Sequence, residues 1–550
     1  MRRPRCGQTA TGNLTIIVMP HGELQMAPGD RCPTAASEDA AAPASFACPK
    51  TVSVRGALRY IQGSGQQVED MEQDARYTAL SSRDRRFDGV FFVGVSSTGI
   101  YCRPVCRARR PQARNCTFFR TAAEAEGSGY RPCLKCRPEL APGRSLTDAS
   151  DRLARAAYER IAAGALDEHS VRDVARDLCV GERHLRRVVG AEFGASPVEL
   201  AQTQRLLLAK QLLTETDLPV SRVAFASGFS SLSRFNTLFR SRYRLSPTGM
   251  RRTRRNGVHV PGSLSLLFEY RPPYDWQWLL GFLATRAIPG IEFVQGGSYM
   301  RSLRVGAHTG WFSVCASRGH ETALEVEISD SLVPALLPVR AAVRRMFDLD
   351  ADPAALVDHF ASDGIMGPLV RGRPGLRLPG AVDGFELAVR GVLGQQISVA
   401  AARTLAGRLH AAYGDAVAGA PGIDRLPASP SRLAEADPDD ISRLGMPLSR
   451  ARTVVLLAQS VTSGDISFAP TADIASAIES LQRVPGIGPW TAEYIAMRGY
   501  QWPDAFPATD LGIRTALRGQ DPARVSEAWR PWRAYAAIHL WNSLSANGNG

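Results

Sequence analysis

Two close pairs of cysteines constrain this chain more than any other feature of its sequence. Cys102 and Cys106 have three residues between them, Cys133 and Cys136 have two, and 26 residues separate the pairs. No histidine occurs between residues 71 and 168, so a metal held there would be bound mainly by thiolates. These spacings are typical of zinc sites with four cysteine ligands. The sequence therefore predicts one zinc ion, with Cys116 between the pairs as a spare thiol or a competing ligand.

Such a site has two possible roles. Four-thiolate zinc is usually structural, and a small domain with few apolar residues needs a stabilising cross-link of this kind. Alternatively, one thiolate is also a nucleophile, because alkylation of one sulfur would remove one of the two net negative charges of the site. Arginines surround the pairs in the sequence, and the loss of negative charge would reduce repulsion from DNA phosphate. The residues alone leave both roles open.

The positive charge is concentrated in the middle of the chain. The 550 residues carry a net charge of +13, whereas residues 71–259 carry +14 and residues 260–550 carry −2. A basic segment favours a nucleic-acid partner; a solvated basic surface in an arginine-rich protein is the alternative.

The length suggests three or four domains. No apolar run of about 18 residues could cross a membrane and no signal-peptide core follows the N-terminus, so a cytoplasmic, reducing compartment is expected.

The beginning of the chain lacks any sustained pattern. Residues 1–70 are rich in Ala, Gly, Pro and Ser, and we expect them to be disordered or to be a mis-assigned extension of a chain that starts at Met71. The cysteine-rich unit is expected over residues 71–145.

This unit resembles a known family. Residues 88–109 read DGVFFVGVSSTGIYCRPVCRAR and residues 130–138 read YRPCLKCRP, and both are similar to the zinc domain of Ada-type adaptive-response regulators. The resemblance implies that all four paired cysteines bind zinc and that Cys102 accepts a methyl group from a methylphosphotriester in DNA. The family's second active site, Pro–Cys–His–Arg, is absent, so repair of O6-alkylguanine by that route is not expected.

Two similar helical patterns follow. Apolar residues at 171, 174, 175 and 178 recur at helical spacing, and a short turn at 179–181 precedes a second apolar stripe. About fifty residues later the pattern repeats, with Gly228 in the turn. Two short helices joined by such a turn are typical of a helix-turn-helix, although one copy alone would also fit a plain helical hairpin.

Residues 146–256 resemble the AraC-type DNA-binding domain over its full length. Residues 220–230 (VSRVAFASGFS) and 243–248 (YRLSPT) match the signature of its second unit. The resemblance implies an all-α domain in which the second helix of each unit enters a major groove. Candidate DNA contacts in the first turns of these helices are Glu182, Arg183, Arg186, Ser231, Ser233 and Arg234.

A glycine-rich hairpin marks the C-terminal region. Residues 481–492 read LQRVPGIGPWTA, in which Gly486 and Gly488 allow a tight turn and Pro489 fits the first turn of a helix. The freed N–H groups can bind a DNA phosphate, which predicts a helix-hairpin-helix; a purely structural turn is equally compatible. Asp510 lies twenty residues after Trp490 and just before a helical run, where an aspartate is most often an N-cap.

The region from about 265 to 541 resembles the AlkA-type 3-methyladenine DNA glycosylase II, a helix-hairpin-helix glycosylase. Segments that carry the resemblance are 272–283, 373–379, 391–398, 444–448 and 529–535. It implies an α+β subdomain over 263–384 and an α-helical domain over 385–550. It also implies that Asp510 is catalytic. The implied lining of the base pocket is Trp490, Tyr494 and Trp541, and the loop that fills the gap left by the flipped nucleotide contains Gln395 and Gln396. Some relatives have leucine in place of Gln396, so the wedge here is more polar.

The lack of lysines and the scarcity of cysteines in this region limit which glycosylase mechanisms are possible. No lysine follows Lys210, so this region cannot form the lysine Schiff base of a glycosylase-lyase, which predicts a monofunctional enzyme that leaves an abasic site. Cys315 is the only cysteine of the region, too few for an iron–sulfur cluster. An N-alkylated purine is cationic, so aromatic faces attract it. A carboxylate can either stabilise the positive charge left on the sugar or activate a water molecule.

Together these patterns predict a multidomain α+β protein: a small zinc-bound α/β domain, an all-α double helix-turn-helix domain, an α+β subdomain and a helical helix-hairpin-helix domain. We expect a methyl sensor, transcription activator and glycosylase in one chain, with double-stranded DNA and RNA polymerase as partners. Methylation of Cys102 is expected to strengthen promoter binding. The alternatives are a regulator with an inactive glycosylase-like domain, which need not keep Asp510 and the hairpin, and a repair enzyme whose first half only targets DNA.

Overall fold

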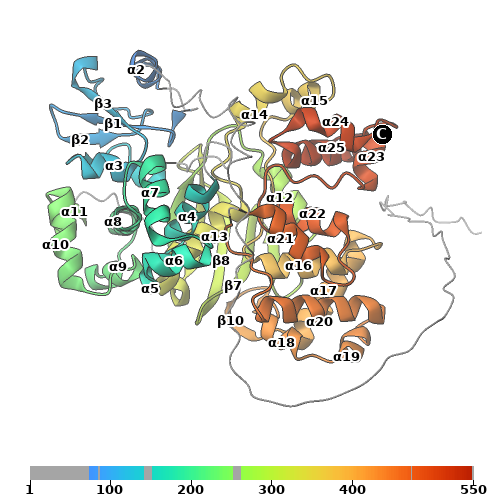
Figure 1. Ribbon diagram of the computed structural model, residues 1–550. Helices are drawn as coiled ribbons and strands as arrows, with labels where there is room; N and C mark the ends of the chain where they lie inside the picture. The colour runs from blue at the N-terminus through green and yellow to red at the C-terminus, as the bar shows by residue number, and fades with distance from the viewer. Residues whose placement is uncertain (1–72, 84–86, 142–151, 252–261, 472, 548–550) are drawn as a thin grey trace, which may run out of the picture.

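The computed structural model describes residues 73–83, 87–141, 152–251, 262–471 and 473–547 (Figure 1). The expectations for residues 1–70 and for a start at Met71 lie outside these ranges. Among the helices of the described segments, none is long and apolar enough to cross a membrane. The predicted mixed α+β, multidomain architecture is confirmed.

The cysteine-rich unit is built on a four-stranded sheet of order β3-β1-β2-β4. Strands β1 (Phe92–Val95), β2 (Ile100–Cys102) and β3 (Cys116–Phe119) are antiparallel, and β4 (Arg131–Pro132) runs parallel to β2. Its helices are α2 (Gln73–Ser82) and α3 (Ala122–Gly127), with 3-10 turns η2 (Ala113–Asn115) and η3 (Pro138–Leu140). Cys102 is the last residue of β2, and Cys133 directly follows β4.

The next unit contains the two predicted helix pairs. The first is α6 (Val171–Asp177) with α7 (Glu182–Phe193), and the second is α9 (Val220–Ala226) with α10 (Leu232–Tyr243). The long α8 (Pro197–Glu215) joins them and begins with a capping box at Ser196. The remaining helices are α4 (Arg152–Ala162), α5 (Ala165–Glu168) and α11 (Pro247–Arg251).

A five-stranded antiparallel sheet of order β5-β9-β8-β7-β6 follows. Its strands are β5 (Ser263–Glu269), β6 (Glu292–Gln295), β7 (Ser298–Val305), β8 (His308–Ala316) and β9 (Ala323–Ser329). The two alternating patterns that predict strands at 264–268 and 324–328 pair directly, with Leu264 opposite Ile328 and Phe268 opposite Leu324. Around the sheet lie α12 (Trp276–Ala284), η4 (Asp330–Ala335) and α13 (Leu336–Met346).

The rest of the chain is mostly helical, as predicted. One exception is a hairpin of β10 (Ala416–Ala420) and β11 (Ile423–Arg425), where Ile423 forms a bridge to Gly290 beside the larger sheet. The helices are α14 (Pro353–Phe360), α15 (Met366–Gly372), α16 (Gly384–Leu393), α17 (Val399–Tyr413), α18 (Pro430–Ala434), α19 (Pro438–Ser442), α20 (Leu448–Thr462), α21 (Ile474–Gln482), α22 (Pro489–Arg498), α23 (Leu511–Ala516), α24 (Pro522–Val525), η5 (Ser526–Trp529) and α25 (Arg533–Asn547).

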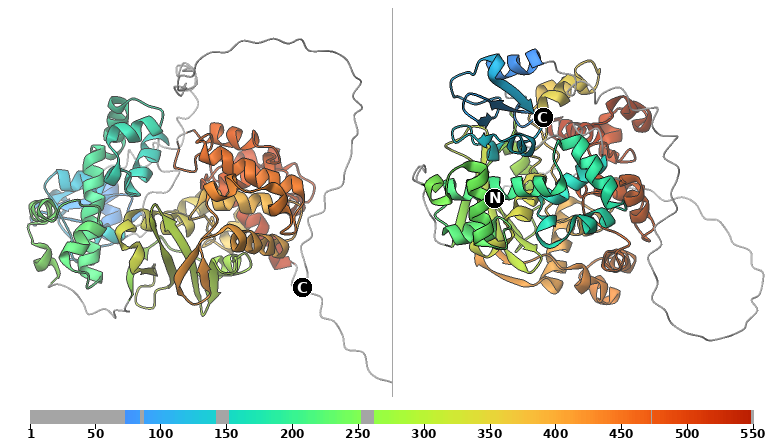
Figure 2. Two further views of the ribbon diagram at one scale, coloured as in Figure 1. Left: turned by 90° about the horizontal axis from the view of Figure 1, so that it is seen from below. Right: turned by 60° about the vertical axis from the view of Figure 1, so that its left-hand side comes forward.

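The second helix-turn-helix unit and the five-stranded sheet share one hydrophobic core. Phe235 and Phe239 of α10 belong to the same buried cluster as Leu266 of β5, Phe312 of β8 and Leu336 of α13. The two views in Figure 2 show these helices packed beside the sheet. Helices α8 to α10 and the following sheet are therefore joined by buried apolar contacts as well as by the chain.

Candidate functional site

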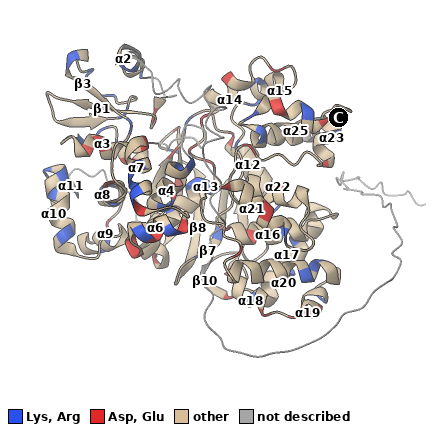
Figure 3. Cartoon of the chain, viewed as in Figure 1, with Lys and Arg blue, Asp and Glu red and all other residues tan. Residues whose placement is uncertain are grey.

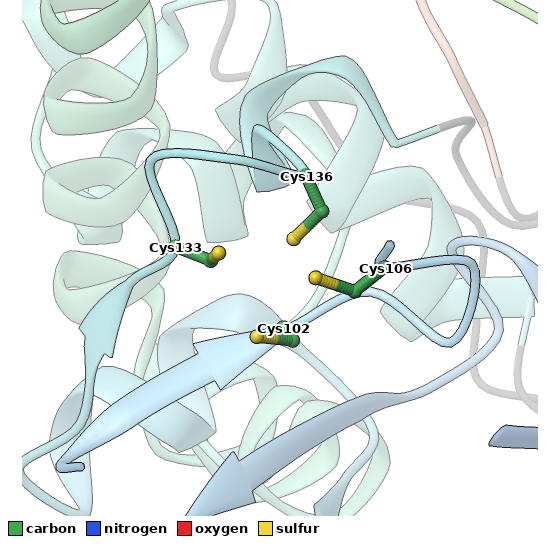
Figure 4. Close-up of side chains that lie close together, drawn as sticks. All are labelled: Cys102, Cys106, Cys133 and Cys136. Atoms are coloured by element: carbon green, nitrogen blue, oxygen red, sulfur yellow. The ribbon is translucent and has the colours of Figure 1, made fainter. Parts of the chain in front are cut away.

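The four paired cysteines converge on one point (Figure 4). Cys102 ends β2, Cys106 lies in the loop after it, and Cys133 and Cys136 flank the turn between β4 and η3. Their sulfur atoms all lie within 4.8 Å of one another, close to the roughly 3.8 Å expected between thiolates around tetrahedral zinc. The donor set fits zinc, and the predicted zinc site is confirmed. Cys116 is not part of it, because its thiol donates to the Gln112 carbonyl (3.4 Å).

Backbone and side-chain groups next to the cysteines orient the site. The N–H groups of Arg103 and Lys135 donate to the sulfurs of Cys136 and Cys133, each at 3.4 Å. The buried guanidinium of Arg103 donates to the Cys136 carbonyl (3.0 Å) and forms ion pairs with Asp88 and with Glu269 of β5. The residue after Cys102 therefore connects the zinc site to the five-stranded sheet.

Asp510 is the centre of a second site, in the C-terminal half. Its carboxylate accepts from the Ile513 N–H (3.0 Å), as an N-cap of α23 does. It also accepts from two indoles, Trp490 Nε1 at Oδ2 and Trp541 Nε1 at Oδ1, each at 2.9 Å. Both oxygens of Asp510 are thus held in place by donors from α22, α23 and α25. Asp510 is therefore the N-cap that the local pattern predicts, and it also lies beside Trp490 and Trp541, as the resemblance implies.

The aromatic residues predicted for the base pocket lie together. The Trp490 and Tyr494 rings, one helical turn apart on α22, are stacked with centroids 5.4 Å apart and planes at 9°. The Tyr494 hydroxyl accepts from Arg498 Nη1 (2.6 Å). Burial alone would raise the pKa of the Tyr494 phenol, but the charges of Arg498 and Arg286 outweigh it and lower that pKa.

Sequence reasoning missed the residues behind this stack. The Phe282 ring of α12 is close to two guanidiniums, with the Arg286 carbon 3.8 Å and the Arg498 carbon 5.0 Å from its centroid. Arg498 is four residues after Tyr494 on one helix, so helical spacing could have identified it. Nothing in the sequence places Phe282 or Arg286 there, because α12 is more than 200 residues away along the chain.

The predicted helix-hairpin-helix is formed by α21 and α22. Gly486 has φ +94, and a Cβ there would collide with the Thr453 hydroxyl. Gly488 is the N-cap of α22 and a Cβ there would meet nothing within 4 Å. The Gln395 amide donates to the Gly486 carbonyl (2.8 Å) and to Thr491 Oγ1 (3.0 Å), so it holds the hairpin. Gln396 is exposed, with φ +57.

The predicted contact residues of the helix-turn-helix units lie in the first turns of α7 and α10. Arg183, Arg186 and Arg234 are exposed, and Arg186 pairs with Glu182 (2.7 Å). Ser231 caps α10 by accepting from the Arg234 N–H (3.4 Å). Figure 3 shows the concentration of basic residues along α10 and α11 and near α6 and α7. A groove on α10 adds residues that the sequence reasoning missed, at helical spacing from Ser233: Asn236, Thr237 and Arg240.

Comparisons with known proteins find matches to each part of the chain. Family models match for the metal binding domain of Ada (residues 75–139), a helix-turn-helix domain (174–253) and the AlkA N-terminal domain (253–383). DNA-3-methyladenine glycosylase 2 of Escherichia coli is 41% identical over 276 residues, covering 50% of this chain and 95% of that protein. A crystal structure of the methylated N-ADA/DNA complex matches 24% of this chain and 98% of that one, with 32% identity and a TM-score of 0.12.

A second relative spans nearly the whole arrangement. The probable bifunctional transcriptional activator/DNA repair enzyme AlkA of Mycobacterium tuberculosis is 41% identical over 482 residues, covering 85% of this chain and 96% of the relative. Identity at this level over all the described units, with the zinc site and the Asp510 site in place, shows that the chain belongs to the family of bifunctional transcriptional activator/DNA repair enzymes AlkA.

Proposed function

We propose that Asp510 is the catalytic carboxylate of a monofunctional DNA glycosylase that removes alkylated bases such as 3-methyladenine and leaves an abasic site. The observation that carries this proposal is the carboxylate held by Trp490 and Trp541 beside the Trp490–Tyr494 stack. A buried carboxylate with both oxygens fixed next to aromatic faces is suited to a cationic base and to the charge that forms on its sugar.

The reaction follows from these positions. The target nucleotide leaves the duplex, and its cationic base lies against Trp490, Tyr494 and Trp541. The C1′–N bond breaks with its electron pair passing to the base, which becomes neutral, while positive charge develops on the sugar. The Asp510 carboxylate stabilises that charge, and a water molecule bonds to C1′ and loses a proton to the solvent. No lysine follows Lys210 to attack C1′, which supports a monofunctional outcome.

The hairpin and the adjacent loop supply the proposed grip on DNA. The N–H groups near Gly486 and Gly488 bind a backbone phosphate at the start of α22. Gln395 braces the hairpin through the Gly486 carbonyl, and the exposed Gln396 fills the space that the flipped nucleotide leaves. The C-terminal half is proposed to consist of subdomains 263–384 and 385–550.

The zinc unit, proposed to span residues 71–145, carries out a second, stoichiometric reaction. The Cys102 sulfur bonds to the methyl carbon of a DNA methylphosphotriester while the carbon–oxygen bond breaks, and the phosphodiester leaves with the electron pair. Cys102, Cys106, Cys133 and Cys136 would hold a zinc ion, which would favour the thiolate form of the Cys102 sulfur. The transfer removes one negative charge from the site, which reduces repulsion from DNA and strengthens promoter binding by the helix-turn-helix domain, proposed to span residues 146–256.

The promoter-binding helices complete the proposed activator. Arg183 and Arg186 of α7, with Ser231 and Arg234 of α10, contact DNA in two successive major grooves. The exposure of the three arginines and the net positive charge of the segment support this role. Activation requires a contact with RNA polymerase, which is the remaining proposed partner.

Base release tests the central proposal. The purified full chain is incubated with methylated duplex DNA, and free 3-methyladenine and 7-methylguanine are quantified, with Asp510→Asn in parallel. Release by the wild type and not by the variant is expected. A folded wild type that releases no base would support the regulator with an inactive glycosylase-like domain.

Methyl transfer is tested separately, as the mass gain of one methyl group on Cys102 after incubation with methylphosphotriester DNA.

A further inference from the structure

A cavity of about 190 Å³ lies where three parts of the chain meet. The zinc unit contributes the start of α3 and η3, the helix-turn-helix unit contributes α4 and α8, and the AlkA-like region contributes α13. Figure 1 shows α4 and α13 next to each other, and the two helices are in contact. At about 30 Å³ per water molecule, the cavity has room for a small polyatomic ion with some of its water.

Arginines from all three parts line this cavity. Arg120 comes from the zinc unit and Arg155 from α4, and three more lie on α13: Arg340, Arg344 and Arg345. Like charges that face one another across an interface are unfavourable unless negative groups lie between them. The stability of this interface therefore depends on which carboxylates neutralise the arginines.

Two of these arginines have a carboxylate partner. Arg155 pairs with Glu159 (2.8 Å), and Arg344 pairs with Asp350 (Nε to Oδ1 3.0 Å). The cavity carboxylate Glu139 is already engaged by Lys210 and Arg137.

Arg340 and Arg345 form no ion pair with a carboxylate among the described residues. Arg340 donates through Nη2 to the Glu139 carbonyl (3.2 Å), and its Nη1 is buried without a hydrogen-bond partner. Arg345 donates to the Val382 carbonyl (3.4 Å). Burial, with the charge of Arg344, lowers the pKa of Arg340 to about 10, and burial lowers the pKa of Arg345. Burial raises the pKa of Asp348, the remaining cavity carboxylate, to about 7, so it is only partly charged at neutral pH.

We propose that this cavity is an anion site that takes phosphate, free or as a phosphate monoester, held by Arg340 and Arg345 of α13 and facing Arg155 of α4. Guanidinium groups bind phosphate oxygens through paired N–H donors, and the unpartnered Nη1 of Arg340 supplies one of them. A bound phosphate would neutralise the facing arginines and fasten the helix-turn-helix unit to the AlkA-like region. The site is distinct from the zinc centre and from the Asp510 pocket and does not depend on the function proposed for either.

Calorimetric titration of the full, zinc-loaded chain with inorganic phosphate, at constant ionic strength set with chloride, tests this proposal. We expect saturable binding of about one phosphate that is weakened at least about tenfold in Arg340→Gln, since a charge-assisted contact is lost. Arg345→Gln should weaken it as well, which keeps the test decisive if one variant fails to fold. Arg432→Gln, at an exposed arginine of α18, is the matched control and should bind as the wild type does.

Titration with adenosine monophosphate and with ribose 5-phosphate separates the two sources of the ligand. Tighter binding than that of inorganic phosphate identifies a monoester, and weaker binding identifies the free ion. The proposal is overturned if phosphate fails to bind at millimolar concentration. It is also overturned if Arg340→Gln and Arg345→Gln bind phosphate as tightly as Arg432→Gln, since the ion would then sit on the DNA-binding surfaces instead.

Discussion

Lys210, the last lysine of the chain, forms a fully buried ion pair with Glu139, three residues after the zinc ligand Cys136. Arg137 pairs with the same glutamate and with Glu215, at the end of the helix that holds Lys210. The loop that carries the last two zinc ligands is therefore fixed to α8, the helix between the two helix-turn-helix units. A change at the zinc site has a direct physical connection to the DNA-binding helices.

Removal of one member of this buried pair should be costly. Lys210→Met leaves the fully buried Glu139 with less positive charge beside it, and we expect a loss of roughly 3 kcal/mol of stability. Lys210→Met combined with Glu139→Gln should recover part of it, because the buried charge is then removed as well. Thermal unfolding of the three proteins measures this. A double variant less stable than Lys210→Met would show that the ion pair is not the cause.

The buried Glu126 predicts a pH effect at the same interface. It accepts from Tyr101 (3.0 Å) and from Thr203 of α8 (3.2 Å), with Lys210 and Arg242 near enough to act on its charge. Burial raises its pKa to about 7, so the folded state favours the protonated form. The associated stability is present at low pH and is lost as pH rises through 7, by about 1.4 kcal/mol between pH 6 and pH 8. The free energy of unfolding of Glu126→Gln, measured with denaturant at the two pH values, should not show this loss. An equal change of the unfolding free energy with pH in both proteins would contradict the prediction.

The indole hydrogen bonds to Asp510 can be separated from the aromatic stack. Trp490→Phe keeps a ring against Tyr494 and removes the Nε1 donor, so we expect kcat to fall by about 10- to 100-fold with a smaller change in KM. Trp529→Phe is a matched control, because Trp529 Nε1 makes the same kind of bond to Asp363 (3.0 Å) elsewhere. Single-turnover base release should be slowed only in the first variant. Equal slowing in both would mean that the effect is one of folding.

The two hairpin glycines should respond differently to alanine. Gly486→Ala introduces a collision with Thr453 at a positive φ and should cost about 1–3 kcal/mol of stability. Gly488→Ala has open space around its Cβ and should keep the fold, while weakening DNA binding if a phosphate approaches there. Thermal unfolding and DNA affinity at several salt concentrations distinguish the two effects. Wild-type DNA affinity in Gly488→Ala would exclude a close phosphate at that position.

Zinc content provides the simplest check of the metal centre. Cys106→Ser should lose most of the bound zinc, because the site needs all four sulfurs. Cys116→Ser should keep one zinc per chain, since its thiol faces the Gln112 carbonyl. Metal analysis of the purified proteins measures both. Loss of zinc from Cys116→Ser alone would show that the ligands are assigned wrongly.

The spacing of apolar residues along the sequence predicted many of the helices and strands, because it indicates which face of each element is buried. Alternation at 264–268 and 324–328 predicted two strands that prove to be neighbours, and cysteine spacing predicted the zinc ligands. What they missed depends on contacts between distant segments. The full burial of Lys210, the role of Gln395 in holding the hairpin and the position of Arg286 behind the aromatic stack depend on partners elsewhere in the chain. The β10–β11 hairpin was missed because it is short and carries small residues that show no clear alternation.

The core shared by α8–α10 and the five-stranded sheet also limits how the chain can be divided. A gene cut between residues 251 and 262 would give two fragments, each with a large apolar surface that water would have to cover. We expect such fragments of this chain to be less soluble than the whole chain, or to bind each other again through this surface. The two parts of the chain therefore tumble as one particle.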